Sequence, residues 1–308
     1  MRKRQPISLG LFPWITETVF QLATHANPAV VVQFREELLS EKVKPEVREA
    51  LETWGPRIEL LRSQRPDGGF GTARAPAETV FLTAGRLLEL HDHGLRGDSP
   101  AVKSAAAFLE KNQRSDGSLP LHYHHNAFVL WVALLHGLSK RPLVKRLVGF
   151  FEERRRRDSG WLDPELEPEL AKKDSSPSCP WTTLHVLLGL TELREQCQDI
   201  AVRRGALFLL QNMFKRSHNS FFGHPDHWRE LDYGYEPTAC FKWAVPKVLL
   251  TLGRLGCGPE TKEVADLLLF LRKTLRGNAR WGAGVEGDDF LTLRVLRSLH
   301  AVQCASEA

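Results

Sequence analysis

The sequence predicts an all-α fold, an α/α toroid of about five to six helix pairs in which amphipathic outer helices ring apolar inner helices. Two observations support this prediction. The stretch Gln64-Arg65-Pro66-Asp67-Gly68-Gly69-Phe70 returns as Gln113-Arg114-Ser115-Asp116-Gly117-Ser118-Leu119, and a long period is typical of repeat architectures. Each copy also separates an amphipathic helical segment from a more apolar one. Because an apolar helix must be buried, this alternation favours two concentric rings over an open solenoid.

The helix pairs can be followed along the chain. Residues 11–26 and 29–40 predict a first pair, interrupted at Asn27-Pro28 because proline breaks a helix. Five further pairs are expected, with outer helices at 45–64, 101–113, 143–157, 200–214 and 260–275, inner helices at 77–90, 126–138, 180–193, 238–255 and 288–302, and turns at Gly68, Gly117, Gly160, Gly223 and Gly282. We interpret the chain as one domain, with the first pair in 1–44, the repeats in 45–302 and a tail at 303–308, since the repeats leave no gap for a boundary.

Composition predicts a reduced, cytoplasmic protein. Lys and Arg exceed Asp and Glu by a formal charge of +5, an excess that is small and scattered, so we expect no nucleic-acid partner and retain peripheral membrane contact as an alternative. The cysteines form no CxxC motif and no disulfide-like spacing. No segment is long and apolar enough to span a bilayer.

The two Gln-x-x-Asp-Gly turns, the first followed by Phe70, resemble the repeat of the prenyltransferase and squalene-hopene/oxidosqualene cyclase superfamily. The resemblance covers about residues 45–302. It implies an α/α toroid in which each such glutamine is structural and braces the next turn. It also implies a terpenoid cyclase-like or prenyltransferase-like protein that handles an isoprenoid or other hydrophobic small molecule in a central cavity.

Candidate catalytic residues stand at the start of the last inner helix. In a toroid the N-termini of the inner helices converge at one mouth of the cavity, where we expect the site. Glu286-Gly287-Asp288-Asp289 resembles a degenerate Asp-x-Asp-Asp motif of class II terpene cyclases, and this implies Asp288 as the acid beside Asp289. Neighbouring carboxyl groups can keep one of them protonated. The alternative interpretation is that these aspartates cap the helix.

A candidate metal site combines His125, Cys179 and Cys240 with Asp288, all at inner-helix starts. Imidazole, thiolate and carboxylate are zinc ligands. The resemblance extends to protein prenyltransferases, which bind zinc with an Asp, a Cys and a His from such positions, and it implies zinc as the candidate cofactor. The alternative is that the cysteines are small core residues.

The candidate substrate-binding residues are mostly aromatic. They are Glu78, Trp131, Trp181, Tyr235 and Phe241, of which Tyr235 belongs to a long aromatic and His-rich loop at 215–237. Aromatic rings on inner helices can line a cavity and stabilise carbocations, or they can fill a core. A loop of this length is either a lid or an elaborated surface loop.

Three functions follow, and the sequence leaves open whether the protein is an enzyme. The first is isoprenoid handling, and the second is a non-catalytic toroid used for binding or as a scaffold. The third is a carbohydrate-active lyase or glycosidase, which needs two carboxylates facing one cavity. Since cyclases of the resembling superfamily pair two such domains, a homodimer or a second toroid domain is a candidate partner.

Overall fold

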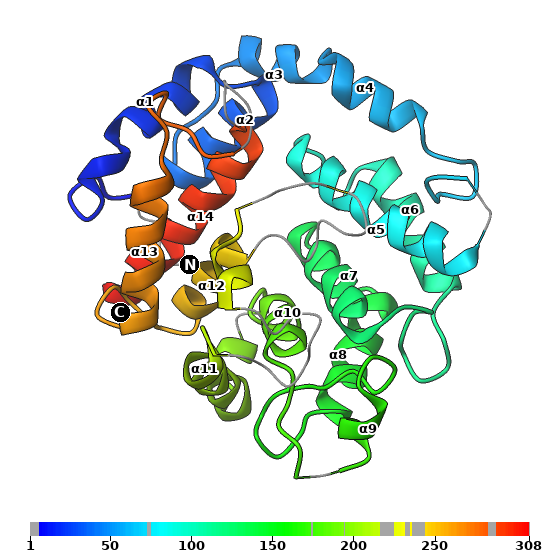
Figure 1. The fold of residues 1–308 in the computed structure, drawn as a ribbon. Coiled ribbons are helices and arrows are strands. Elements are labelled where there is room, and N and C mark those ends of the chain that lie inside the picture. The colour runs from blue at the N-terminus through cyan, green and yellow to red at the C-terminus, as the bar shows by residue number, and fades with distance from the viewer. Residues whose placement is uncertain are drawn as a thin grey trace.

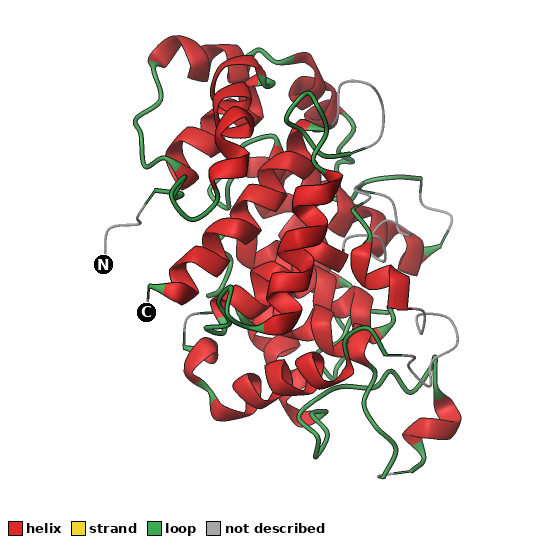
Figure 2. Ribbon diagram, turned by 60° about the vertical axis from the view of Figure 1, so that its left-hand side comes forward, coloured by secondary structure: helices red, strands yellow, loops and turns green. Residues whose placement is uncertain are grey.

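The computed structural model describes residues 6–72, 75–173, 175–193, 195–215, 225–231, 235, 244–282 and 288–307. Within these residues all regular secondary structure is helical, as Figure 2 shows. The elements follow one another around a ring in chain order (Figure 1). The predicted all-α toroid is therefore confirmed.

The inner helices surround the centre of the ring, and the outer helices lie outside them (Figure 1). The inner set is α2 (Pro28–Gln33), continued by η2 (Phe34–Leu38), then α5 (Pro76–Asp92), α7 (Tyr123–Leu135), α10 (Pro180–Leu190), α12 (Ala244–Arg254) and α14 (Asp289–Ser306). The outer set is α1 (Thr16–His25), α3 (Pro45–Glu52), α4 (Gly55–Arg62), α6 (Pro100–Lys111), α8 (Pro142–Glu153), α11 (Ile200–Asn212) and α13 (Lys262–Thr274). Short helices occupy the connections, namely η1 (Pro13–Ile15), α9 (Pro168–Ala171), η3 (Gln196–Gln198) and η4 (Pro225–Arg229).

Burial follows the predicted alternation. Every residue of α10 is buried, and in α7 the run from Asn126 to Leu134 is buried as well, because these helices carry apolar side chains all round. Inner helices also approach closely at small residues. A Cβ added at Gly253 of α12 would lie 2.6 Å from the backbone carbon of Ala301 in α14. Glycine therefore lets these two backbones touch.

Two expected boundaries differ in the structure. Residues 45–64 form α3 and α4 rather than one outer helix, because Gly55-Pro56 starts a new helix after Trp54, and proline is favoured in a first turn. The segment 303–308, expected as a tail, continues α14 to Ser306. Gln303 is buried there, so packing extends the helix beyond the repeat pattern.

The repeated turns share one set of hydrogen bonds. Gln64 Nε2 donates to the backbone oxygens of Gly68 and Ala101, both at 2.9 Å, and so ties its own turn to the first residues of the next outer helix. Gln113 does the same with Gly117 and Leu143, at 2.6 and 3.1 Å. The glutamines are therefore structural braces.

The residue that follows each turn fastens it to an inner helix. Four such amides donate to a side-chain oxygen at 2.7–3.1 Å, in the pairs Phe70–Thr83, Leu119–Asn126, Trp161–Thr183 and Trp281–Thr292. The left-handed turn residue is glycine in the first two repeats, at Gly68 and Gly117. In the third and fifth repeats it is Ser159 and Ala279, which make the same backbone bonds, rather than the expected Gly160 and Gly282.

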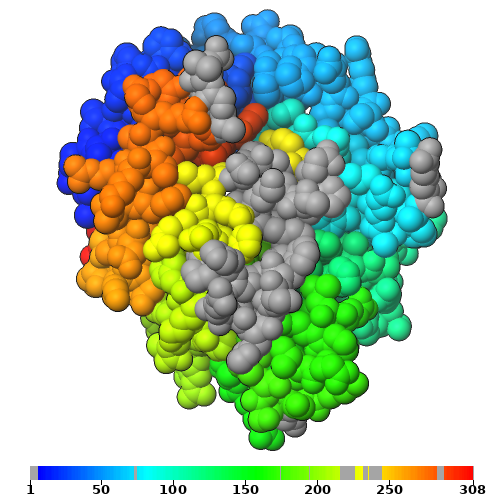
Figure 3. All heavy atoms as spheres, in the orientation of Figure 1, coloured from blue at the N-terminus to red at the C-terminus, as the bar shows by residue number. Residues whose placement is uncertain are grey.

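The ring closes where the first and last helix pairs meet. Figure 3 shows the N-terminal and C-terminal segments side by side on the rounded surface. Asp289 accepts a hydrogen bond from the backbone amide of Asn27 at 3.0 Å. Gln303 accepts one from the amide of Ser8 at 2.7 Å. Both ends of the described chain therefore hold the toroid shut.

Candidate functional site

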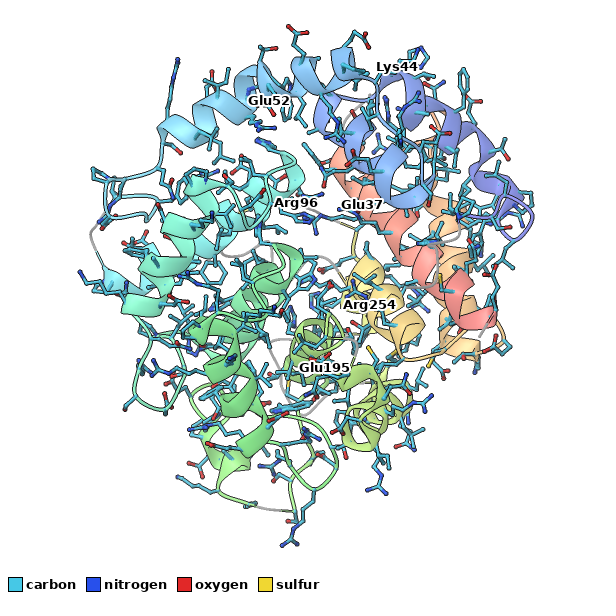
Figure 4. All side chains as sticks on the ribbon, turned by 180° about the vertical axis from the view of Figure 1, so that it is seen from behind. Glu37, Lys44, Glu52, Arg96, Glu195 and Arg254 are labelled. Carbon is cyan, nitrogen blue, oxygen red and sulfur yellow. The ribbon has the colours of Figure 1, made fainter. Side chains whose placement is uncertain are left out.

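A central cavity of about 910 Å³ lies among the inner helices. Its lining comes from η2, from the carboxyl ends of α5 and α7, from the segment that follows α10 and from much of α12 and α14. Apolar side chains form part of its wall, including Trp131, Leu134, Leu250 and Leu291. The remainder is charged. Figure 4, seen from behind, shows Arg96 and Glu37 pointing toward one another beside the central opening, with Arg254 facing it from α12.

A carboxylate shared by two arginines lies at the edge of the cavity. Glu37 stands on η2, a π-helical turn, an element that is frequent at functional sites. Arg96 Nη2 lies 2.8 Å from Glu37 Oε1, and Arg297 Nη2 lies 2.7 Å from Glu37 Oε2. Burial raises the pKa of Glu37, but the two guanidinium charges outweigh it, so the pKa lies below its usual range. Glu37 is therefore ionised.

A second ion pair spans from α5 to α14. Asp92 and Arg294 are 1% and 9% exposed, and Arg294 Nη2 lies 2.8 and 2.7 Å from the two oxygens of Asp92. Tyr235 also donates its hydroxyl to Asp92 Oδ2 at 2.9 Å. Beside them, Gln33 Nε2 donates to the backbone oxygen of Asp92. The junction of α5 with α2, η2 and α14 is thus held by polar contacts.

Trp131 forms one wall of the cavity and is surrounded by charge. Its Nε1 donates to Glu192 Oε1 at 3.1 Å, and Arg254 Nη1 lies 2.6 Å from the same oxygen. Lys247 Nζ and Arg294 Cζ lie 5.9 and 5.5 Å from the indole centroid. These distances are within cation–π range, so the ring stabilises both cations.

Of the two predicted acids, Asp288 caps α14 and Asp289 makes other contacts. Asp288 Oδ1 accepts from the amide of Leu291 at 2.9 Å, the geometry of an N-cap. Asp289 pairs with Arg280 at 2.9 Å. Burial raises the pKa of Asp288, and the charges of Asp92 and Asp289 add to this rise. Neither aspartate is among the residues that line the cavity.

The predicted substrate-binding residues lie in different parts of the structure. Trp131 lines the cavity. Trp181 is buried and stacks on Trp228 with 5.0 Å between ring centroids, which is core packing. Tyr235 holds Asp92, and Glu78 is exposed at the start of α5. Phe241 and most of the 215–237 loop lie outside the described residues.

The described donors do not assemble the predicted zinc site. Cys179 is buried, and burial raises the pKa of its thiol to about 11. Burial likewise lowers the pKa of His125 to about 3, and its ring lies 4.2 Å from that of Phe81. Cys240 lies outside the described residues. Among the residues that are described, no three His, Cys, Asp or Glu side chains are placed to hold a metal ion.

The cavity extends along α12 and α14 and reaches the carboxyl ends of the other inner helices, whereas the sequence suggested a site at their N-termini. Its rim includes His91 at the end of α5, Gly137 after α7 and Glu192 after α10. These carboxyl ends carry partial negative charge, which suits the cations gathered there. One signal could have drawn attention to the cavity wall: Arg294 and Arg297 are one turn apart on an inner helix, where charged side chains are costly to bury.

No helix in the described part of the chain is both long and apolar enough to cross a membrane. No protein-family profile matches the sequence, and no curated protein matches it.

Among solved structures, the fold is similar to the type II terpene cyclase MstE from Scytonema in its apo form. The TM-score is 0.51 at 15% identity, over 96% of this chain and 88% of that chain. A variant of MstE in complex with its substrate geranylgeranyl dihydroxybenzoate gives a TM-score of 0.50 at 14% identity, with the same coverage. At such identity the likeness concerns the fold alone, and it shows that this chain has a terpenoid cyclase-like fold.

Proposed function

We propose that the protein handles an isoprenoid or similarly apolar small molecule in its central cavity. The observation that carries this proposal is the cavity itself. Its volume of about 910 Å³ is at the upper end of the range typical of small-molecule sites, and such sites combine apolar walls with a few polar groups. The terpenoid cyclase-like fold supports the same ligand class, since the MstE substrate carries a geranylgeranyl chain.

The charges of the cavity favour a ligand with an anionic group. Among the described residues, six cationic side chains line it, against the three acidic residues Glu36, Glu37 and Glu192. The cations are Arg96, Arg203, Lys247, Arg254, Arg294 and Arg297. A carboxylate or phosphate on the ligand would be attracted to this excess, while the apolar chain would lie against Trp131 and the neighbouring leucines.

Catalysis by proton donation is less well supported than binding. A cyclisation started by a carboxylic acid needs that acid to stay protonated. In the described lining, Glu37 and Glu192 are each paired with arginine. Asp288, with its raised pKa, remains the candidate acid, but it caps α14. These pairings favour a non-catalytic binding protein as the second candidate function.

Binding of polyprenyl compounds tests the proposal. Titration with geranylgeraniol and with geranylgeranyl diphosphate, followed by native mass spectrometry, should show one ligand per chain. Trp131→Ala should weaken binding by about tenfold or more, because it removes a buried aromatic contact. Phe20→Ala is the matched control, since Phe20 is 55% exposed on α1. If neither compound binds the wild-type protein, the isoprenoid proposal is wrong.

Product analysis then separates an enzyme from a binding protein. Purified protein is incubated with each bound compound, and the extract is examined for cyclised or hydrolysed products. Turnover that Asp288→Asn abolishes would support the acid role. Turnover that this substitution leaves unchanged would remove Asp288 from the mechanism. Binding without turnover would favour the second candidate function.

A further inference from the structure

A buried histidine stands in the wall of the cavity. His91, the second-last residue of α5, is 5% exposed and lines the cavity. Its Nδ1 is buried and has no hydrogen-bond partner among the described residues, and its Nε2 makes no hydrogen bond to them either. Because Nδ1 is enclosed, the ring reaches the cavity by the edge that carries Nε2. Buried polar groups are almost always hydrogen-bonded, and the function proposed above gives His91 no role.

The carboxylate of Asp92 defines which nitrogen of His91 carries the hydrogen. Nδ1 lies 3.6 Å from Asp92 Oδ1, which is too long for a good hydrogen bond but close enough for the carboxylate charge to act on the ring. A neutral imidazole has one N–H and one lone pair. The carboxylate repels a lone pair at Nδ1 and attracts an N–H there, so the hydrogen lies on Nδ1. Nε2 is therefore a hydrogen-bond acceptor at the cavity.

The charged groups around His91 keep its ring neutral. Burial lowers the pKa of His91 to about 3, and the charges of Arg96 and Arg297 add to this fall, while Asp92 acts in the opposite direction. Both arginines are themselves bound to Glu37. At neutral pH Nε2 therefore keeps its lone pair, and the neighbouring cations would repel a ligand ammonium group.

We propose that Nε2 of His91 accepts a hydrogen bond from a hydroxyl group of the ligand, so that the cavity selects alcohols. A hydroxyl can replace a water at such an acceptor with little loss, whereas an ether oxygen or an apolar group leaves the acceptor unbonded. The hydroxyl is recognised separately from any anionic group, because Arg96 and Arg297 beside His91 already bind Glu37. This inference rests on the proposed function and adds a hydroxyl group to the ligand.

A matched alcohol and ether test the hydroxyl contact. The full-length protein is titrated with geranylgeraniol and with its methyl ether, which keeps the chain and the oxygen but has no hydrogen to donate. Binding is followed by quenching of tryptophan fluorescence, since Trp131 lines the cavity. The wild-type protein should bind the alcohol about fivefold more tightly, the usual value of one hydrogen bond. Equal affinities would overturn the proposal, and this comparison needs no variant.

The ratio of the two dissociation constants separates recognition from packing, since a structural effect changes both constants together. His91→Phe removes the acceptor and should bring the ratio to about one. His91→Gln should retain most of the preference, because its side-chain oxygen can take the place of Nε2. His93→Phe is the matched control, since His93 is also buried but is not among the described residues that line the cavity. A preference for the alcohol that survives His91→Phe would overturn the proposal.

Dodecanol and its methyl ether distinguish this inference from the proposed function. If dodecanol binds with a preference over its ether that depends on His91, while geranylgeraniol does not bind, the hydroxyl contact stands and the isoprenoid ligand is wrong. If geranylgeraniol and its ether bind equally well, the hydroxyl contact is wrong and the proposed function stands. If none of the four compounds binds the wild-type protein, both are wrong.

Discussion

Arg294 donates from one nitrogen to both carboxylate oxygens of Asp92, at 2.8 and 2.7 Å, although the two residues are 202 positions apart. The contact joins the last inner helix to the first full-length one. It lies where the ring is held by polar groups, next to the hydrogen bond from Gln33 to the backbone of Asp92. We infer that this ion pair is a main fastening of the closed toroid.

Asp92→Asn should destabilise the protein by about 3–5 kcal/mol, because it removes the carboxylate charge that balances the buried guanidinium of Arg294. Urea unfolding followed by circular dichroism measures the change. Glu169→Gln is the matched control, since it breaks an exposed pair with Lys172 and should cost less than about 1 kcal/mol. Equal losses in the two variants would contradict the role given to Asp92.

The turn glutamine can be tested in the same way. Gln64→Ala removes two hydrogen bonds to backbone oxygens, and at about 0.5–1.5 kcal/mol each the expected loss is about 1–3 kcal/mol. Gln211 is exposed at the end of α11, so Gln211→Ala should leave the free energy of unfolding nearly unchanged. A loss at Gln64 no larger than at Gln211 would show that the brace contributes nothing.

Two glycine substitutions should change the stability of the fold in opposite directions. Gly68 has φ of +90°, and an added Cβ would lie 2.3 Å from the backbone oxygen of Ser104. Gly68→Ala should therefore destabilise the fold by at least about 1–2 kcal/mol. Gly149 lies within α8 and has nothing within 4 Å of such a Cβ. Gly149→Ala should stabilise by about 0.5–1 kcal/mol, and thermal unfolding distinguishes the two directions.

Acid should weaken the folded state through buried histidines. Burial lowers the pKa of His91 to about 3 and that of His136 to about 4, from 6.5. Between those values and 6.5 the unfolded chain binds protons that the folded protein does not. Stability should therefore be full above about pH 6.5 and fall as pH drops toward 4, by up to about 1.4 kcal/mol per pH unit for each histidine.

Urea unfolding at several pH values between neutral and about 5 measures this slope. His136→Gln should make the slope shallower because it removes one of the buried histidines with a lowered pKa. His25→Gln should leave it unchanged, since His25 is exposed at the end of α1. A wild-type stability that does not change over this range would disprove the assignment.

The fold could be predicted because its determinants are local. Gln64, Asp67 and Gly68 make their contacts within one turn and with the next outer helix. Their spacing in the sequence is therefore enough to predict the turn and the helix that follows it. The turns at Ser159 and Ala279 were harder to place because neither has the glycine that marks the first two. Tertiary packing, rather than a glycine in the sequence, sets the left-handed backbone conformation of Ser159 and Ala279.

The site depended on contacts that the sequence spacing does not encode. Glu37, Arg96 and Arg297 meet from three distant segments, and no motif links them. Of the predicted substrate-binding residues that are described, Trp131 is the one that lines the cavity. The sequence suggested a site at the N-termini of the inner helices, whereas the cavity runs along α12 and α14 to residues at the carboxyl ends of the other inner helices. Zinc binding, peripheral membrane contact and pairing with a second toroid remain predictions.

Closure by the chain's own ends affects how the protein should unfold. Gln303 holds Ser8, and Asp289 holds Asn27, so the first and last repeats each have a neighbour on both sides. A linear array of repeats frays from its two exposed ends. A ring in which the ends are fastened together has no such starting point, and the loss of any one repeat removes two interfaces at once. Hydrogen exchange in the inner helices should accordingly occur through one cooperative opening of the whole ring.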